Sequence, residues 1–165
     1  MYNYRKNMRL SGYDYNQTGG YFVTICTHEK KCTLSNIIPG DALRHAEIQL
    51  TQLGQVAEQV LCELCEQYGV RLDACAIMPN HIHIIICIEE RNERVSLGRF
   101  VGAFKSIVAN RWLRKCNEKG IVMGKVWQRD FYDHILRNEA DWMEKIKYIN
   151  DNPDKWAFDE LFLEK

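Results

Sequence analysis

The 165-residue sequence has no long hydrophobic run, no net charge and no evident disulfide framework. A membrane-spanning helix needs about 20 consecutive apolar residues, and no run approaches that length. The first residues also lack the apolar core of a secretory signal peptide. Seven cysteines, an odd number spread along the chain, fit reduced thiols better than a disulfide scaffold. We therefore expect a cytoplasmic protein without a membrane partner.

The zero formal charge hides an uneven distribution along the chain. The segment from Arg99 to Arg137 contains nine Lys/Arg and three Asp/Glu, whereas residues 138–165 contain eight acidic and four basic side chains. A basic central segment on a neutral protein suggests a local surface that binds polyanions. Chance clustering of lysine and arginine on solvated helix faces is the alternative.

The length and the absence of internal repeats or low-complexity linkers predict a single domain over residues 1–165. Residues 1–18 are polar and aromatic and are interpreted as an N-terminal arm. Residues 154–165 form a short acidic C-terminal tail whose aromatic side chains could pack back on the domain.

Hydrophobic periodicity and capping residues predict the elements between the arm and the tail. The expected strands cover residues 21–27, 70–77, 81–88 and 126–136, and a short hairpin is expected around Pro39-Gly40. The expected helices cover 52–68, 97–116 and 139–152, with Thr51, Ser96 and Asn138 as N-caps. The order βαββαβ predicts an α+β, ferredoxin-like fold, an antiparallel sheet with two helices on one face, followed by an additional C-terminal helix.

The strand predicted at 81–88 carries two histidines and a run of isoleucines. Side chains alternate along a strand, so His81 and His83 share one face and the isoleucines at even-numbered positions share the other. Two neighbouring imidazoles at the start of a core strand form half of a divalent-metal site. Two hydrogen-bonded histidines at a strand end explain the pattern equally well.

The last predicted helix can cover the histidine face, because the other two helices are expected on the isoleucine face. Tyr148 and Asn152 are four residues apart and share one side of this helix. Two imidazoles and an amide oxygen would hold Mg²⁺ or Mn²⁺ with open positions, and the ion would act as a Lewis acid on a phosphodiester. The tyrosine hydroxyl would then be a nucleophile; an amphipathic surface tyrosine is the simpler alternative.

These residues resemble a known family. His81-Ile82-His83 resembles the HUH motif, in which a hydrophobic residue separates two histidines. The preceding Met78-Pro79-Asn80 and the later segment 148–153 are similar to the small single-tyrosine transposases. Further segments resemble the REP-associated tyrosine transposase branch, and the likeness covers roughly residues 9–156. These segments are Gly12 to Tyr15, Gly20 to Thr27, Trp127 to Arg129, Tyr132 to Ile135 and Arg137 to Glu139.

The resemblance implies a ferredoxin-like enzyme that cuts single-stranded DNA near hairpins with Mg²⁺ or Mn²⁺. By this likeness His81, His83 and Asn152 would be metal ligands and Tyr148 the nucleophile. Attack on the scissile phosphate would leave a 5′-phosphotyrosine link and a free 3′-OH, and reverse attack by a 3′-OH would rejoin the strand. Relatives act as dimers in trans or as monomers in cis, so a homodimer remains an open alternative.

Basic side chains are the candidates for contact with the DNA backbone. The expected set is Arg99, Lys105, Arg111, Arg114, Lys125 and Arg129. Lys145, one turn before Tyr148, would assist electrostatically, although an exposed surface lysine is the simpler interpretation. His134 matches the family and would orient a neighbour or contact DNA rather than bind metal.

Two other functions fit parts of the sequence. A domesticated transposase without catalysis would use the same face to bind hairpin DNA, but it would not require both histidines together with Tyr148 and Asn152. A ferredoxin-like metabolic enzyme or metal sensor would have no use for the basic segment. The sequence therefore favours a DNA-nicking and strand-transfer enzyme.

Overall fold

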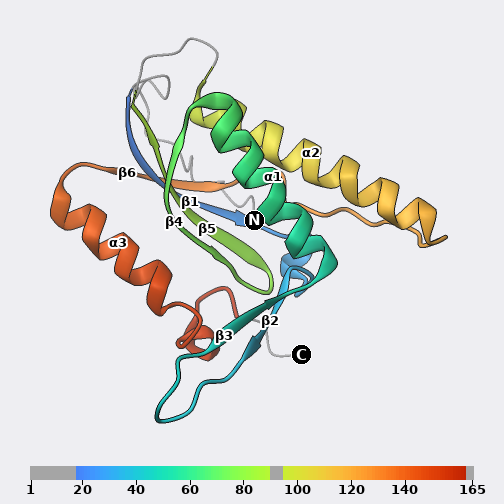
Figure 1. Cartoon of the computed structure of the whole chain (residues 1–165), viewed down its shortest axis with the longest axis horizontal. Coiled ribbons are helices and arrows are strands. Elements are labelled where there is room, and N and C mark those ends of the chain that lie inside the picture. The colour runs from blue at the N-terminus through green and yellow to red at the C-terminus, as the bar shows by residue number, and fades with distance from the viewer. Residues whose placement is uncertain (1–17, 90–94, 163–165) are drawn as a thin grey trace, which may run out of the picture.

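The computed structural model describes residues 18–89 and 95–162, so the arm predicted at 1–18 lies almost entirely outside the described residues. Four strands form one antiparallel sheet in the order β4-β5-β1-β6 (Figure 1). They are β1 (Gly19–Cys26), β4 (Arg71–Ile77), β5 (His81–Ile88) and β6 (Tyr132–Leu136). Helix α1 (Gln52–Tyr68) joins β1 to β4, and α2 (Leu97–Glu118) joins β5 to β6. This connectivity confirms the ferredoxin-like prediction.

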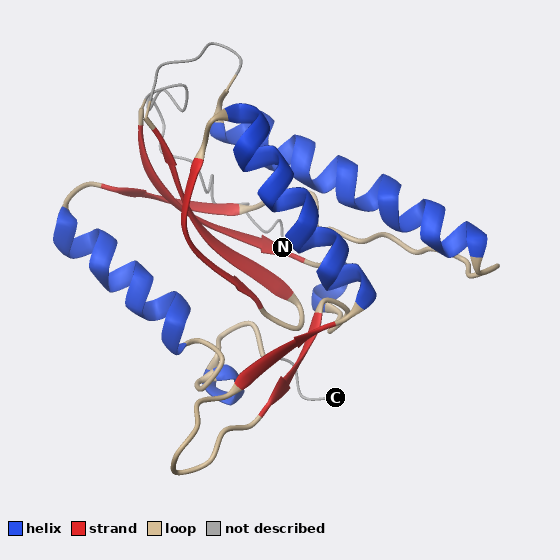
Figure 2. Ribbon diagram, viewed as in Figure 1, coloured by secondary structure: helices blue, strands red, loops and turns tan. Residues whose placement is uncertain are grey.

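The helices form two layers around the sheet (Figure 2). Helices α1 and α2 cover one face, where the even-numbered isoleucines of β5 are buried in the main core. Helix α3 (Glu139–Asp151) lies on the other face, where Phe22, Ile85 and Ile149 belong to a smaller core. The alternation of side chains along β5 therefore points His81 and His83 toward α3, as the sequence predicts.

Local capping sets the ends of the helices. The side chains of Thr51, Ser96 and Asn138 each accept a hydrogen bond from a first-turn backbone N–H, so all three predicted N-caps are confirmed. Gly69 ends α1 in the left-handed conformation with φ of 62°. Among the described helices, none is long and apolar enough to cross a membrane.

The hairpin predicted around Pro39-Gly40 is present as a separate two-stranded sheet of β2 (Ser35–Ile38) and β3 (Glu47–Leu50). The strand predicted at 126–136 is too long, because only its last five residues pair with β1. Residues 126–131 leave the regular ladder: Trp127 makes one isolated bridge to Thr27, and the Gln128 N–H donates to the Cys26 carbonyl. The apparent alternation in this segment reflects one-sided packing of an irregular chain, with Val126 buried.

Candidate metal and tyrosine site

His81 and His83 begin β5, one of the two central strands of the sheet, and both are buried. Their ring centroids lie 4.4 Å apart. The Nε2 atom of each is buried and has no hydrogen-bond partner among the described residues. Buried polar atoms are almost always satisfied in folded proteins. These two nitrogen atoms are therefore candidate ligand atoms.

The other nitrogen of each ring is held by a neighbour. The Nδ1 of His83 lies 2.8 Å from Thr24 Oγ1. The Nδ1 of His81 lies 2.8 Å from Asn80 Oδ1, while the Asn80 amide nitrogen donates to the Leu161 carbonyl. Because Asn80 presents its oxygen, His81 must donate from Nδ1, and its Nε2 carries the lone pair. Such outer contacts fix the ring orientation of metal-binding histidines.

Burial controls the charge of the two imidazoles. It lowers the pKa of His81 to about 4, against the opposing effect of the nearby Asp159 carboxylate. Burial and the neighbouring His81 also hold the pKa of His83 well below its ordinary value. Both rings are therefore neutral near pH 7, which is the form that binds a metal ion.

Helix α3 brings Tyr148 and Asn152 to the same place. The Tyr148 ring lies 5.3 Å from His83 and 5.9 Å from Phe22, measured between ring centroids, and 46% of the residue is exposed. Asn152 is buried, and its Oδ1 is a third buried atom without a partner among the residues that the structure describes. The side of α3 that the sequence predicts to be functional thus faces the histidines of the same chain.

The tail contributes Asp159, a residue that the sequence reasoning missed. Its ligand atoms and those of His81 and His83 all lie within 4.8 Å of one another. Its Oδ2 accepts a 2.8 Å hydrogen bond from Asn152 Nδ2, and its Oδ1 accepts from the Leu161 backbone N–H. The tail packs back over the site, with the Trp156 ring 5.9 Å from that of His81. The acidic composition of the tail and its aromatic side chains were the sequence signals for this contact.

The donor set fits a divalent metal ion. Two neutral imidazoles, an amide oxygen and a carboxylate offer mixed nitrogen and oxygen ligands. Three of the four groups, on His81, His83 and Asn152, present buried atoms with no partner inside the described part of the chain. Carboxylate and carbonyl oxygens suit Mg²⁺ and Mn²⁺.

Tyr148 lines a cavity of about 640 Å³, which we call the tyrosine cavity. Its lining comes from the sheet, the loop before β6, α3 and the tail, and it includes Phe22, Lys30, His83, Phe131, Tyr132, Lys145, Asp159 and Glu160. Burial and the negative charges of Asp159 and Glu160 raise the pKa of Tyr148. The tyrosine is therefore protonated at neutral pH and needs assistance to act as a nucleophile.

Residues 43–152 match the family described as "Transposase IS200 like". The chain belongs to the IS200-like transposase family. It is also 32% identical to an uncharacterized protein of Haemophilus influenzae, over 98% of this chain and 94% of that protein. It is 23% identical to the REP-associated tyrosine transposase of Escherichia coli, over 68% of this chain and 61% of that protein. The resemblance to single-tyrosine, REP-associated transposases is thereby confirmed.

Solved structures agree with this fold. The structure of a REP-associated tyrosine transposase bound to a REP hairpin has a TM-score of 0.63 and 19% sequence identity, covering 97% of this chain and 77% of that chain. A transposase structure from Deinococcus radiodurans has a TM-score of 0.53 and 17% identity, covering 87% of this chain and 95% of that chain. At these identities the likeness supports the shared fold.

The predicted DNA contacts of this IS200-like protein are not gathered on one surface. Arg99 and Arg114 are exposed on α2, on the sheet face opposite the histidines. Lys125 and Arg129 are exposed in the segment between α2 and β6. Lys145 lines the tyrosine cavity, as does Lys30, a cation that the sequence reasoning overlooked.

Arg111 and Lys105 contact other elements of the protein. Arg111 forms a two-pronged ion pair with Glu63, which links α2 to α1. Lys105 donates from Nζ to the backbone carbonyls of Gln128, Arg129 and Asp130 at 3.2, 3.3 and 2.9 Å. Arg111 thus links the two helices on the face opposite the histidines, whereas Lys105 holds the loop that precedes β6.

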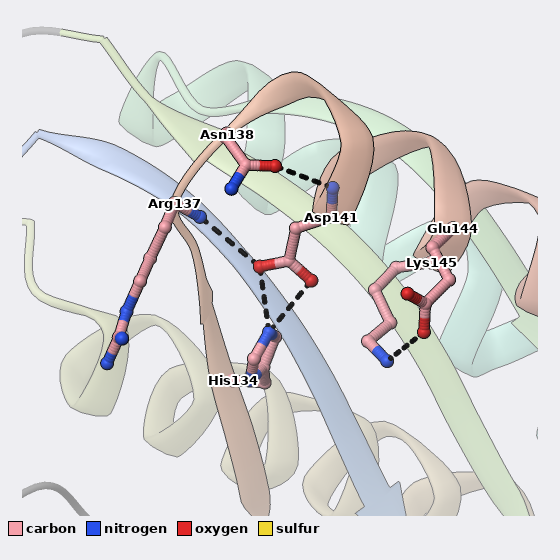
Figure 3. Close-up of polar contacts among 6 residues, drawn as sticks. All are labelled: His134, Arg137, Asn138, Asp141, Glu144 and Lys145. Atoms are coloured by element: carbon pink, nitrogen blue, oxygen red, sulfur yellow. Dashed lines mark hydrogen bonds and ion pairs between the residues drawn. The ribbon is translucent and has the colours of Figure 1, made fainter.

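His134 joins β6 to α3 (Figure 3). Its Nε2 lies 3.0 and 2.9 Å from the two carboxylate oxygens of Asp141, which also accepts from the Arg137 backbone N–H. Burial opposes ionisation of Asp141, but these hydrogen bonds outweigh it and lower the pKa of its carboxyl group. His134 thus orients the first turn of α3, the helix that carries Tyr148. The sequence predicted that His134 would orient a neighbour or contact DNA rather than bind metal.

Proposed function

We propose that the protein is a divalent-metal-dependent transposase that cleaves and rejoins single-stranded DNA through Tyr148. The observation that carries the proposal is the placement of Tyr148 beside three buried, unsatisfied ligand atoms on His81, His83 and Asn152. Membership of the IS200-like transposase family supports the same reaction class.

The residues that would hold Mg²⁺ or Mn²⁺ are His81, His83 and Asn152, with the Asp159 carboxylate beside them. When bound, the ion supplies Lewis-acid neutralisation of the phosphodiester. The protein supplies neutral imidazoles, and because Asn80 and Thr24 contact the Nδ1 atoms, the Nε2 atom of each ring is left for the ion. The pKa of Tyr148 is raised, so its hydroxyl relies on this neutralisation to become reactive.

In the proposed cleavage step, Tyr148 Oη attacks the scissile phosphorus. A new P–O bond forms to tyrosine, and the bond between phosphorus and the 3′ oxygen breaks. The departing oxygen takes a proton and becomes a 3′-OH, while the tyrosine proton passes to solvent through the open cavity. Rejoining is the reverse attack by a 3′-OH on the phosphotyrosine, so one P–O bond replaces another and no external energy source is needed.

We propose that cleavage occurs in cis. The Tyr148 and His83 rings of one chain already lie 5.3 Å apart, so this arrangement needs no second subunit to complete the site. A homodimer that exchanges its α3 helices is the alternative. The contact between His134 on β6 and Asp141 on α3 would then have to break within each chain or form between the two chains.

The proposed substrate is a hairpin with single-stranded flanks. The solved relative with a TM-score of 0.63 is a transposase bound to a REP hairpin. In this chain, Lys30 and Lys145 at the tyrosine cavity would meet the backbone near the cleaved phosphate. The exposed Lys125 and Arg129 would contact the strand farther from the site.

The test is incubation of the protein with Mn²⁺ and single strands that contain palindromes from the DNA flanking its gene. A denaturation-resistant protein–DNA adduct should form, and it should be absent in Tyr148→Phe. An adduct that survives Tyr148→Phe would overturn the nucleophile assignment. Metal-independent binding without any adduct would instead support a hairpin-binding protein that has lost catalysis.

A further inference from the structure

The tyrosine cavity has an aromatic wall that the cleavage step does not use. Phe22, Phe131 and Tyr132 line it together with Tyr148. Phe22 is buried beneath the site, whereas Tyr132 is 46% exposed at the start of β6. A tyrosine that lines a cavity yet keeps half of its surface open can present a ring face to a ligand.

Tyr132 lies in the same cross-strand row as His83. Tyr132 pairs with Thr24 across β6 and β1, and Thr24 pairs with His83 across β1 and β5. Paired residues in an antiparallel sheet share one face, so these three side chains form a row. With neighbouring strands about 4.8 Å apart, Tyr132 lies about 10 Å from His83 across the sheet. Adjacent nucleotides of one strand can bridge the two positions.

Two lysines lie beside the rings of this wall. Lys145 Nζ lies 5.9 Å from the centre of the Phe22 ring, and Lys105 Nζ lies 5.5 Å from that of Phe131. Lys105 also holds the backbone carbonyls of residues 128–130, which fixes the loop that carries Phe131. Asp130, Asp159 and Glu160 bring negative charge to the same cavity. The DNA backbone is therefore expected beside Lys145 and Lys105, away from these carboxylates.

We propose that Tyr132, backed by Phe131, is a stacking subsite for one unpaired nucleobase of the DNA strand that Tyr148 cleaves. The inference rests on the proposed function and adds an element that binds and positions the DNA strand. Every base has a π face, so aromatic stacking binds single-stranded DNA with little sequence preference. The cavity volume of about 640 Å³ lies within the range of about 300–1,000 Å³ that is usual for small-ligand pockets.

The first test measures binding without cleavage, in EDTA, with a (dT)20 strand that carries a single 2-aminopurine. Fluorescence anisotropy gives the affinity, and quenching of 2-aminopurine reports stacking. Tyr132→Ala should weaken binding about tenfold and abolish quenching, whereas Tyr132→Phe, which keeps the ring, should retain both. Phe158→Ala, which removes an exposed aromatic outside the cavity, should bind like the wild type. Circular dichroism checks that each variant is folded.

The second test separates this inference from the proposed function. The same proteins are assayed for a covalent adduct with hairpin DNA and Mn²⁺. If the wild type forms the adduct but Tyr132→Ala binds and quenches like the wild type, the stacking subsite is wrong and the cleavage function stands. If no protein forms an adduct but Tyr132→Ala alone loses affinity and quenching, the stacking subsite stands and the cleavage function is wrong.

Discussion

Asn152 Nδ2 donates a 2.8 Å hydrogen bond to Asp159 Oδ2, which ties the end of α3 to the tail. Because the amide nitrogen is engaged, Oδ1 of Asn152 is the atom left for the metal site. The carboxylate therefore orients an expected ligand, and it also lies within reach of both histidines.

Removal of the Asp159 carboxylate should weaken metal binding. We expect Asp159→Ala to lower Mn²⁺ affinity about 10- to 100-fold, the effect usual for groups that orient metal ligands. Isothermal titration of the metal-free protein measures the change. Glu160→Gln is the matched control, because Glu160 lines the cavity but does not belong to the ligand cluster. Equal losses in both variants would show a general charge effect rather than a role for Asp159.

The buried histidines should make the metal-free protein sensitive to acid. Burial lowers the pKa of His81 from 6.5 to about 4. Between these two values the unfolded chain binds more protons than the folded protein, so stability falls as the pH drops from 6.5 toward 4. The loss is about 3 kcal/mol at complete protonation, and His83 adds a change in the same direction.

Urea unfolding in EDTA between pH 4 and 7 measures this dependence. His81→Gln should flatten the curve of unfolding free energy against pH relative to the wild type. His45→Gln, which alters a histidine whose side chain is 95% exposed and pairs with Asp154, should change the slope less than His81→Gln does. A wild-type curve without a slope in this window would contradict the burial argument.

The contact between His134 and Asp141 should stabilise the tyrosine helix. Both side chains are partly exposed, so we expect a coupling free energy of about 1 kcal/mol in a double-mutant cycle of His134→Gln and Asp141→Asn. Urea unfolding at pH 6 provides the four values. Glu144→Gln, which breaks the neighbouring exposed pair with Lys145 (Figure 3), should cost less than about 0.5 kcal/mol. Strict additivity in the cycle would show that the His134–Asp141 contact contributes nothing to stability.

Gly20 allows α3 to approach the sheet. A Cβ atom at this position would lie 2.1 Å from the ring of Trp142, so Gly20→Ala must displace this ring or the helix that carries it. We expect a loss of stability of about 1–3 kcal/mol, as for other overpacked cores, and a slower cleavage reaction as Tyr148 moves from His83. Chemical denaturation and the adduct assay measure the two effects.

Gly102 supplies the control for this substitution. It lies within α2, and an added Cβ would have no neighbour within 4 Å. Gly102→Ala should therefore stabilise the protein by about 0.5–1 kcal/mol through helix propensity. If both alanine variants behaved alike, close approach of Trp142 would not explain the need for glycine at position 20.

Patterns within the sequence were sufficient to predict most of the fold. Helical periodicity, N-caps such as Thr51 and the stop at Gly69 act over a few residues, so they can be read without knowledge of distant contacts. The alternation of β5 also placed the two histidines on the face opposite the even-numbered isoleucines. The same reasoning failed for residues 126–131, because strand formation depends on a partner and regular pairing with β1 stops at Thr24 and Tyr132.

The sequence by itself therefore determined the strand that carries His81 and His83 and the helix that carries Tyr148 and Asn152. Only the tertiary structure decided which groups meet at long range. Asp159 reaches the histidines because the tail folds over them, and Arg99 and Arg114 lie away from them because α2 covers the other face. Such contacts depend on how elements pack in three dimensions, which spacing along the chain does not encode.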